Sequence, residues 1–144
     1  MSIATELVKL VHDICRQRVL PAVTWLHLPP EHPRDPHHKK FGALFLADGS
    51  CGFFFTRLDT MLGHIRAHID IDNIIGTPVL DLAAGYASSD PLQRTLGLGA
   101  LNAISQHLFS TDKTCLEYGS DPLGQMEVAT AHHVGMVGFF RPLV

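Results

Sequence analysis

The hydrophobic pattern of this chain changes its period near Leu58, and this change limits the fold more than any other feature of the sequence. Before it, three short segments rich in apolar and aromatic residues are typical of β-strands: residues 22–28, 41–47 and 51–56. After it, apolar residues recur at the three- and four-residue spacing of helices. Because the strands come first and the helices follow, the sequence predicts an α+β fold with helices on one face of a small antiparallel sheet.

Turn signals connect the three strands into a meander. Asp48-Gly49-Ser50 separates the second strand from the third and is typical of a tight hairpin. Residues 29–40 separate the first strand from the second; they are rich in proline and charge, and they include the pair His37-His38. This composition favours an exposed loop over a preorganised metal site.

An amphipathic helix is predicted over residues 2–20, before the first strand. Ser2 is a suitable N-cap, and Pro21 ends the helix. Five apolar residues share the face expected to pack on the core: Ile3, Leu7, Leu10, Val11 and Ile14.

Three further helices are predicted after the strands. The first begins near Leu58, and the second covers residues 76–87 with Thr77 as its N-cap and Pro78 at its first position. Asp90-Pro91 repeats this cap-and-proline signal and begins a helix that is apolar nearly all round, so we expect it to be central and buried. Small residues in it would allow another element to approach closely: Gly97, Gly99, Ala100 and Ala103.

Composition excludes several classes of function. The 144 residues are 46% hydrophobic, carry a net charge of −3 and show no basic stripe, so we expect no nucleic-acid partner. No apolar stretch reaches the ~20 residues that span a bilayer, so we expect no membrane partner. The three cysteines are widely spaced, and the N-terminus lacks a signal-peptide pattern, which together favour a cytoplasmic location.

Histidine is the unusual residue of this composition, with ten copies. His64 and His68 stand four residues apart on a predicted helix, so both imidazoles project from one side and can share a cation. Asp72 extends the same edge if the helix persists. The sequence identifies no third ligand, and the competing interpretation is a solvated helix edge.

A second histidine pair, His132-His133, precedes an apolar strand predicted over residues 134–140. Ligand clefts commonly form where two domains meet, and a turn with packed imidazoles is the alternative interpretation. Cys51 follows the hairpin without a basic partner in the sequence, which favours a structural role. Asn102, a polar residue in the apolar helix, is expected to be buried and to make a structural hydrogen bond. No dinucleotide, phosphate-loop or hydrolase motif is present.

Two segments resemble a known family. Residues 94–103, RTLGLGALNA, resemble its "iGlAaiNA" helix, and residues 134–144, VGMVGFFRPLV, resemble its "VGMVGyFpPLv" signature. The family is prokaryotic, of unknown function, and described as "putative heavy-metal chelation" proteins. The resemblance implies a first domain similar to the N-terminal domain of enolase, followed by a Rossmann-like domain.

On this basis we expect an enolase-N-terminal-like α+β domain over residues 1–131, and over residues 132–144 the opening strand of a Rossmann-like domain that is otherwise missing. The expected cofactor is a divalent transition metal, with His64, His68, His132 and His133 as candidate ligands. Because an unpaired apolar strand at the terminus would have to pack against another chain, we expect a homo-oligomer or a separately encoded Rossmann-like partner. The first hypothesis is therefore a binding or oligomerisation module. Alternatives are half of an enzyme that handles a small molecule or metal cofactor, and a remnant without activity.

Overall fold

The computed structural model describes residues 2–30, 41–56 and 60–113, which lie within one unit, Met1–Lys113. Three predictions fall outside these residues: the loop around His37-His38, the domain boundary after residue 131 and the terminal strand at 134–140. They stay predictions.

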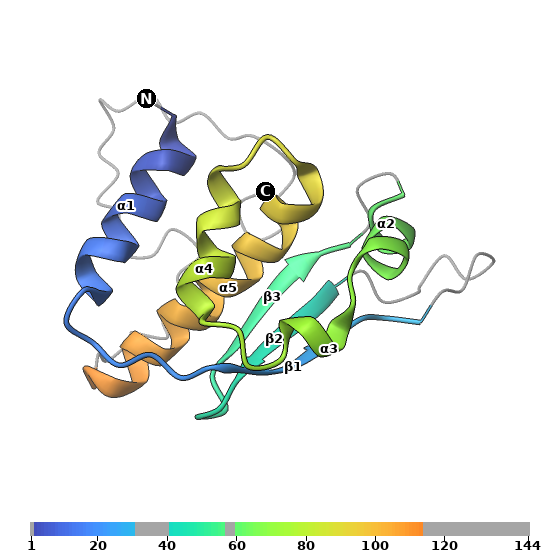
Figure 1. Cartoon of the computed structure of the whole chain (residues 1–144). Helices are drawn as coiled ribbons and strands as arrows, with labels where there is room; N and C mark the ends of the chain where they lie inside the picture. The colour runs from blue at the N-terminus through green and yellow to red at the C-terminus, as the bar shows by residue number, and fades with distance from the viewer. Residues whose placement is uncertain (1, 31–40, 57–59, 114–144) are drawn as a thin grey trace, which may run out of the picture. The chain divides into compact units, whose positions relative to one another are not determined.

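The three predicted strands form one antiparallel sheet in the order β1-β2-β3 (Figure 1). Leu26 of β1 lies opposite Leu44 of β2, and Phe45 of β2 lies opposite Cys51 of β3. The strand bounds agree with the sequence prediction to within one residue at each end: β1 Val23–His27, β2 Phe41–Leu46 and β3 Cys51–Phe55.

The predicted hairpin joins β2 to β3. Gly49 adopts a left-handed backbone with φ of 87°, which a glycine accepts without strain. The backbone N–H and the hydroxyl of Ser50 both donate to the carboxylate of Asp48, at 3.0 Å and 2.9 Å. The turn is therefore held by the side chain that begins it.

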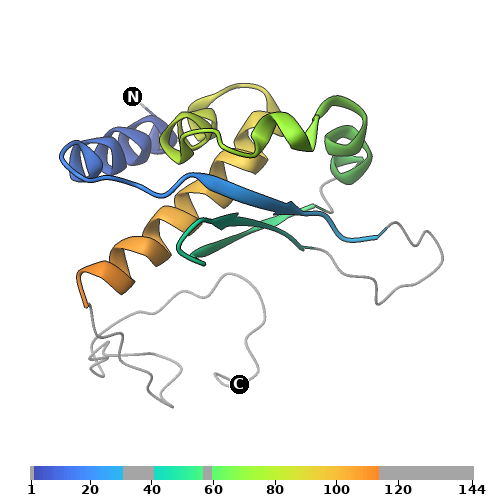
Figure 2. The ribbon, with the colours of Figure 1, turned by 60° about the horizontal axis from the view of Figure 1, so that its bottom comes forward.

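The helices gather on one side of this sheet (Figure 2), which confirms the predicted α+β class. The longest of them, α5, packs along β3 and β2, and the core forms between this helix and the inner sheet face. The bounds are α1 Ile3–Cys15, α2 Met61–His68, α3 Ile71–Ile74, α4 Val79–Ala84, the 3-10 helix η1 Gly85–Ala87 and α5 Pro91–Thr111.

Small residues bring α5 close to its neighbours, as the sequence predicted. A methyl group added at Gly52 of β3 would meet the backbone of Gly99 and Ala103 of α5, and one added at Gly97 would meet the backbone of Tyr86. Asp90 caps α5, accepting a hydrogen bond from the N–H of Leu92 at 3.0 Å.

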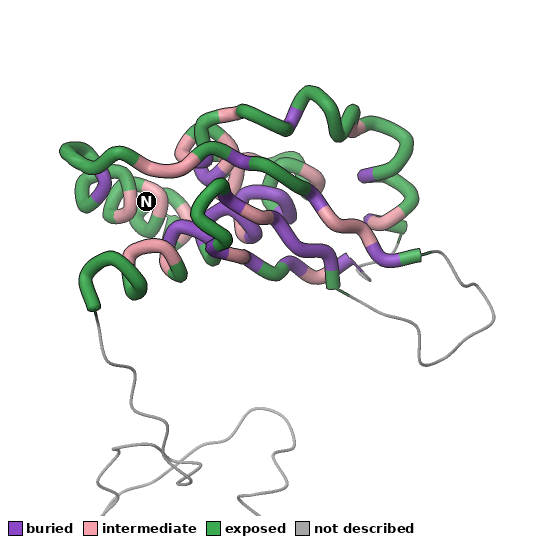
Figure 3. Tube along the Cα trace, turned by 90° about the horizontal axis from the view of Figure 1, so that it is seen from below, coloured by how far each residue is buried: buried purple, intermediate pink, exposed green. Residues whose placement is uncertain are grey.

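The prediction for the first helix was wrong about the residue at which the helix ends and about which of its faces is buried. Ser2 caps α1 as expected, but the helix ends at Cys15, where the chain turns and the N–H of Arg18 donates to the carbonyl of Cys15 at 2.9 Å. The expected core face is largely exposed (Figure 3), with Ile3, Leu7, Leu10 and Ile14 all open to solvent. The less exposed stripe lies one residue further along, and α1 meets η1 and α4: Ala4, Val8, Val11 and Cys15.

Two further helix predictions need correction. The helix carrying His64 ends at His68, because Ile69 is extended and a separate short helix starts at Ile71. Thr77 does not cap α4; its hydroxyl donates instead to the carbonyl of Asn73 at 3.0 Å, and α4 begins at Val79. None of the helices in the described parts of the chain is long and apolar enough to cross a membrane.

Candidate functional site

The histidine pair on α2 is the first candidate site. His64 and His68 are both exposed, and their ring centres lie 5.1 Å apart with the ring planes inclined at 62°. Nδ1 of His68 donates to the carbonyl oxygen of His64 at 3.0 Å, so Nε2 is the ring nitrogen of His68 that can bind an ion.

No third ligand stands beside this pair in the described residues. Because α2 ends at His68, Asp72 lies on the separate helix α3 and does not extend the edge of the pair, as the sequence had suggested. Within residues 2–30, 41–56 and 60–113, no group of three or more His, Cys, Asp or Glu is placed to hold a metal ion. His132 and His133 lie outside the described residues.

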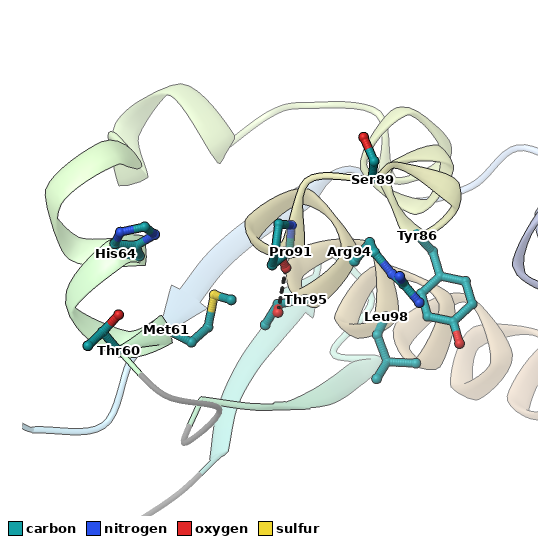
Figure 4. A pocket seen from close by; sticks show the side chains of 9 residues that line it. All are labelled: Thr60, Met61, His64, Tyr86, Ser89, Pro91, Arg94, Thr95 and Leu98. Atoms are coloured by element: carbon teal, nitrogen blue, oxygen red, sulfur yellow. Dashed lines mark hydrogen bonds between the residues drawn. The ribbon is translucent and has the colours of Figure 1, made fainter.

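A cavity of about 560 Å³ opens beside His64, between α2, η1 and the first turns of α5. Its floor is apolar, and its walls carry hydroxyl groups, an imidazole and a guanidinium. In Figure 4, His64 and Thr60 lie on one side, Tyr86 and Arg94 on the other, and Met61 and Thr95 between them. Its lining residues are Thr60, Met61, His64, Tyr86, Ser89, Pro91, Arg94, Thr95 and Leu98.

Sequence reasoning missed this cavity. It found His64 and the helix start at Asp90-Pro91, which places Arg94 in the first turn of α5. It gave no sign that Tyr86 and Arg94 meet His64 around one space, because these residues come from three elements that only tertiary packing brings together. His68, four residues from His64, does not line the cavity.

The comparison with protein families matches the central part of this chain. Residues 40–105 match the model of the family described as "Putative heavy-metal chelation". The resemblance predicted from the sequence is confirmed over this segment, which contains His64, His68 and every lining residue of the cavity. It leaves out α1 and β1 and ends before the terminal VGMVGFF motif. No curated protein and no solved structure matches the chain.

The two described cysteines, Cys15 and Cys51, are free thiols. Burial raises the pKa of Cys51, which keeps the thiol protonated at neutral pH and agrees with the structural role predicted for it. Burial likewise raises the pKa of Cys15, against a smaller opposing effect of Arg18.

Two polar side chains of α5 connect this helix to the β2–β3 hairpin and to β3. Nδ1 of His107 lies 2.7 Å from the carboxylate of Asp48, tying α5 to the hairpin. Burial of Asp48 acts to raise its pKa, but hydrogen bonds from His107 and Ser50 outweigh that effect and hold the pKa below its ordinary value. Asn102 is exposed rather than buried, yet its amide donates to the carbonyl of Phe53 at 2.8 Å, so the predicted structural hydrogen bond is confirmed.

The outer face of the sheet is a second distinctive surface, which we call the aromatic face. Side chains of Trp25, Phe41 and Phe53 are 53%, 55% and 61% exposed on it. Trp25 stacks on Phe45 with ring centres 5.0 Å apart, and Phe41 meets Phe55 edge-on at 5.5 Å. The three strands contain no Asp, Glu, Lys or Arg.

Proposed function

We propose that this protein is a metal-binding module of the heavy-metal chelation family, in which His64 and His68 bind one divalent transition-metal ion. The observation that carries the proposal is the placement of two exposed imidazoles side by side on α2. The family match over residues 40–105, which includes both histidines, supports it.

The geometry of the pair fits a shared ion. Two imidazoles bound at ~2.1 Å to one tetrahedral ion have ring centres ~5 Å apart. The observed separation is 5.1 Å, and the bond from Nδ1 of His68 to a backbone carbonyl is the usual way in which a protein orients a ligating histidine. Such an ion would act as a polarising centre or a bound cargo, and the pair would hold it by Nε2 of His68 and one ring nitrogen of His64.

Two imidazoles are half of a tetrahedral ligand set, so the remaining ligands must come from outside the pair. Association with a second copy of the chain is a separate part of the proposal, and the aromatic face, on the side of the sheet away from the helices, supports it. Its rings are large and flat, and the strands that carry them contain no Asp, Glu, Lys or Arg, which is the composition of an interface centre. In a two-fold dimer the same face would pack on itself, sheet against sheet. The enolase-like relation and a separately encoded Rossmann-like partner stay predictions.

Titration calorimetry of the full chain with Zn²⁺ or Ni²⁺ tests the metal site. We expect about one ion per chain, and affinity at least tenfold lower in each of His64→Ala and His68→Ala. His12→Ala is the matched control, because His12 is an exposed helical histidine on α1 with no neighbouring histidine in the described residues. Unchanged affinity in the double variant His64→Ala/His68→Ala would assign any bound ion to other residues and overturn the proposal.

The alternative function, half of an enzyme that handles a small molecule, has one observation in its favour. His64 lines a cavity of about 560 Å³ together with Arg94 and Tyr86, which is a suitable volume for a small organic ligand. The described residues place no nucleophile beside a general base in this cavity, so binding is better supported than catalysis.

A further inference from the structure

We infer that the cavity between α2, η1 and α5 binds a small organic anion, with the guanidinium of Arg94 as its counter-charge. This inference goes beyond metal binding by the histidine pair and does not depend on it, although His64 contributes to both.

Most polar side chains around the cavity have no hydrogen-bond partner in the described residues. Among the described residues, none donates to or accepts from the guanidinium of Arg94, the hydroxyls of Tyr86, Ser89 and Thr60, or the ring of His64. Thr95 differs, since its hydroxyl donates to the carbonyl of Pro91 at 2.8 Å. Five polar groups from α2, η1, α5 and the turn before α5 therefore face one space with no hydrogen bond to another described side chain, which is the arrangement of a ligand site.

The charge of the lining residues selects an anion. Arg94 carries a permanent positive charge, and none of the nine described lining residues is Asp or Glu. The planar guanidinium presents paired N–H donors that match the two oxygens of a carboxylate or a phosphate. Tyr86, on the same side of the cavity in Figure 4, adds a hydroxyl donor.

The apolar part of the lining selects an organic ligand over a bare inorganic ion. Met61 is buried and lies between the two polar sides of the cavity in Figure 4, and Leu98 and Pro91 add further apolar surface. A ligand that fits has an acidic group against Arg94, an apolar middle over Met61 and a polar atom near His64. The cavity volume of about 560 Å³ suits a molecule of that size.

Heteronuclear NMR titration of the full chain tests this site with three probes of similar shape: benzoate, phenyl phosphate and the uncharged benzamide. We expect saturable shifts for benzoate or phenyl phosphate, confined to residues around the cavity, and much weaker binding of benzamide. The tighter of the two anions then identifies a carboxylate or a phosphate as the natural acidic group. Equal binding of all three probes, or no saturable shift at millimolar concentration, would overturn the inference.

Substitutions locate the charge that does the binding. Arg94→Gln should weaken binding of the preferred anion at least tenfold, while Arg94→Lys keeps the charge and should lose less. Arg16→Gln is the matched control. It removes an exposed arginine at the C-terminal end of α1, outside the cavity lining, and should bind the anion as the unmodified protein does. The NMR spectrum of each variant reports at the same time whether the fold is intact. An Arg94→Gln variant that folds and binds with unchanged affinity would contradict the inference.

One further variant separates this inference from the metal proposal. His68 belongs to the histidine pair but not to the cavity lining. His68→Ala should therefore lose metal affinity and keep anion binding, and Arg94→Gln should do the reverse. If each variant impaired both ligands equally, a single shared site would replace the two that we describe.

Discussion

The two faces of the sheet are both apolar, but within the described residues only one of them is packed under helices. On the inner face Leu44 and Phe54 are fully buried under α5, while on the outer, aromatic face Trp25 and Phe53 stay mostly exposed. The inner face carries Gly52, where the backbone of α5 comes close to the strand, and the aromatic face presents large rings at most positions. Hydrophobicity alone therefore does not decide which face receives a helix; the small residue that permits close approach does.

The sharpest test of this contrast uses two neighbours on β3. Phe54→Ala should lower the free energy of unfolding by ~3–5 kcal/mol, because it empties a packed site. Phe53→Ala makes the same chemical change on the aromatic face, where the ring is mostly exposed, and should cost less than ~1 kcal/mol. Urea unfolding followed by circular dichroism measures both. Similar losses in dilute, monomeric protein would mean that the aromatic face is covered within the chain.

A glycine pair tests the close approach of β3 and α5. Gly52→Ala should destabilise the protein by ~1–3 kcal/mol, because the added methyl group meets the backbone of Gly99 and Ala103 rather than a movable side chain. The matched change Gly63→Ala lies on exposed α2 with nothing within 4 Å, and should stabilise by up to ~1 kcal/mol through helix propensity. Thermal unfolding of the two variants shows directly whether each substitution lowers or raises the stability of the protein. A tolerated Gly52→Ala would show that α5 can move away from the sheet at little cost.

The aromatic face can also be tested as an association surface. Phe53→Lys places a charge among its rings and should raise the dissociation constant of a homodimer at least tenfold, as measured by analytical ultracentrifugation. Ile14→Lys makes the same kind of change in the exposed stripe of α1 and should leave association unchanged. If Ile14→Lys weakened association and Phe53→Lys did not, the interface would lie on α1. A monomeric unmodified protein would refute the proposed dimer.

The smallest expected effect concerns the hydrogen bond between Asp48 of the hairpin and His107 of α5. The pKa of Asp48 is lowered in the folded state, so its contribution to stability is present above its ordinary pKa and is lost as the pH falls through the lower folded-state value. Asp48→Asn should therefore cost ~1 kcal/mol at neutral pH, and the difference from the unmodified protein should shrink in acid. Asp13→Asn, on exposed α1, is the control. A gap that persists unchanged in acid would mean that the cost comes from the altered turn and not from the charge.

Local signals in the sequence predicted the elements that depend on neighbouring residues. The Asp48-Gly49-Ser50 hairpin and the Asp90 cap formed as expected, because a turn and a helix start are determined by a few adjacent side chains. The histidine pair was found for the same reason, since a four-residue spacing on a helix is local. The cavity was not found, because Arg94 and Tyr86 meet His64 only after α2, η1 and α5 have packed together.

The first helix shows where the sequence stops determining the structure. The sequence by itself determined that α1 is a helix capped by Ser2 and that it is apolar along one side. Two adjacent stripes of that side are apolar, and only the contact with η1 and α4 decided that the one ending at Cys15 is buried while Ile3 and Leu7 remain exposed. Periodicity fixes which residues share a face of a helix, whereas the rotation of that helix about its axis is set by the shape of the surface it packs against.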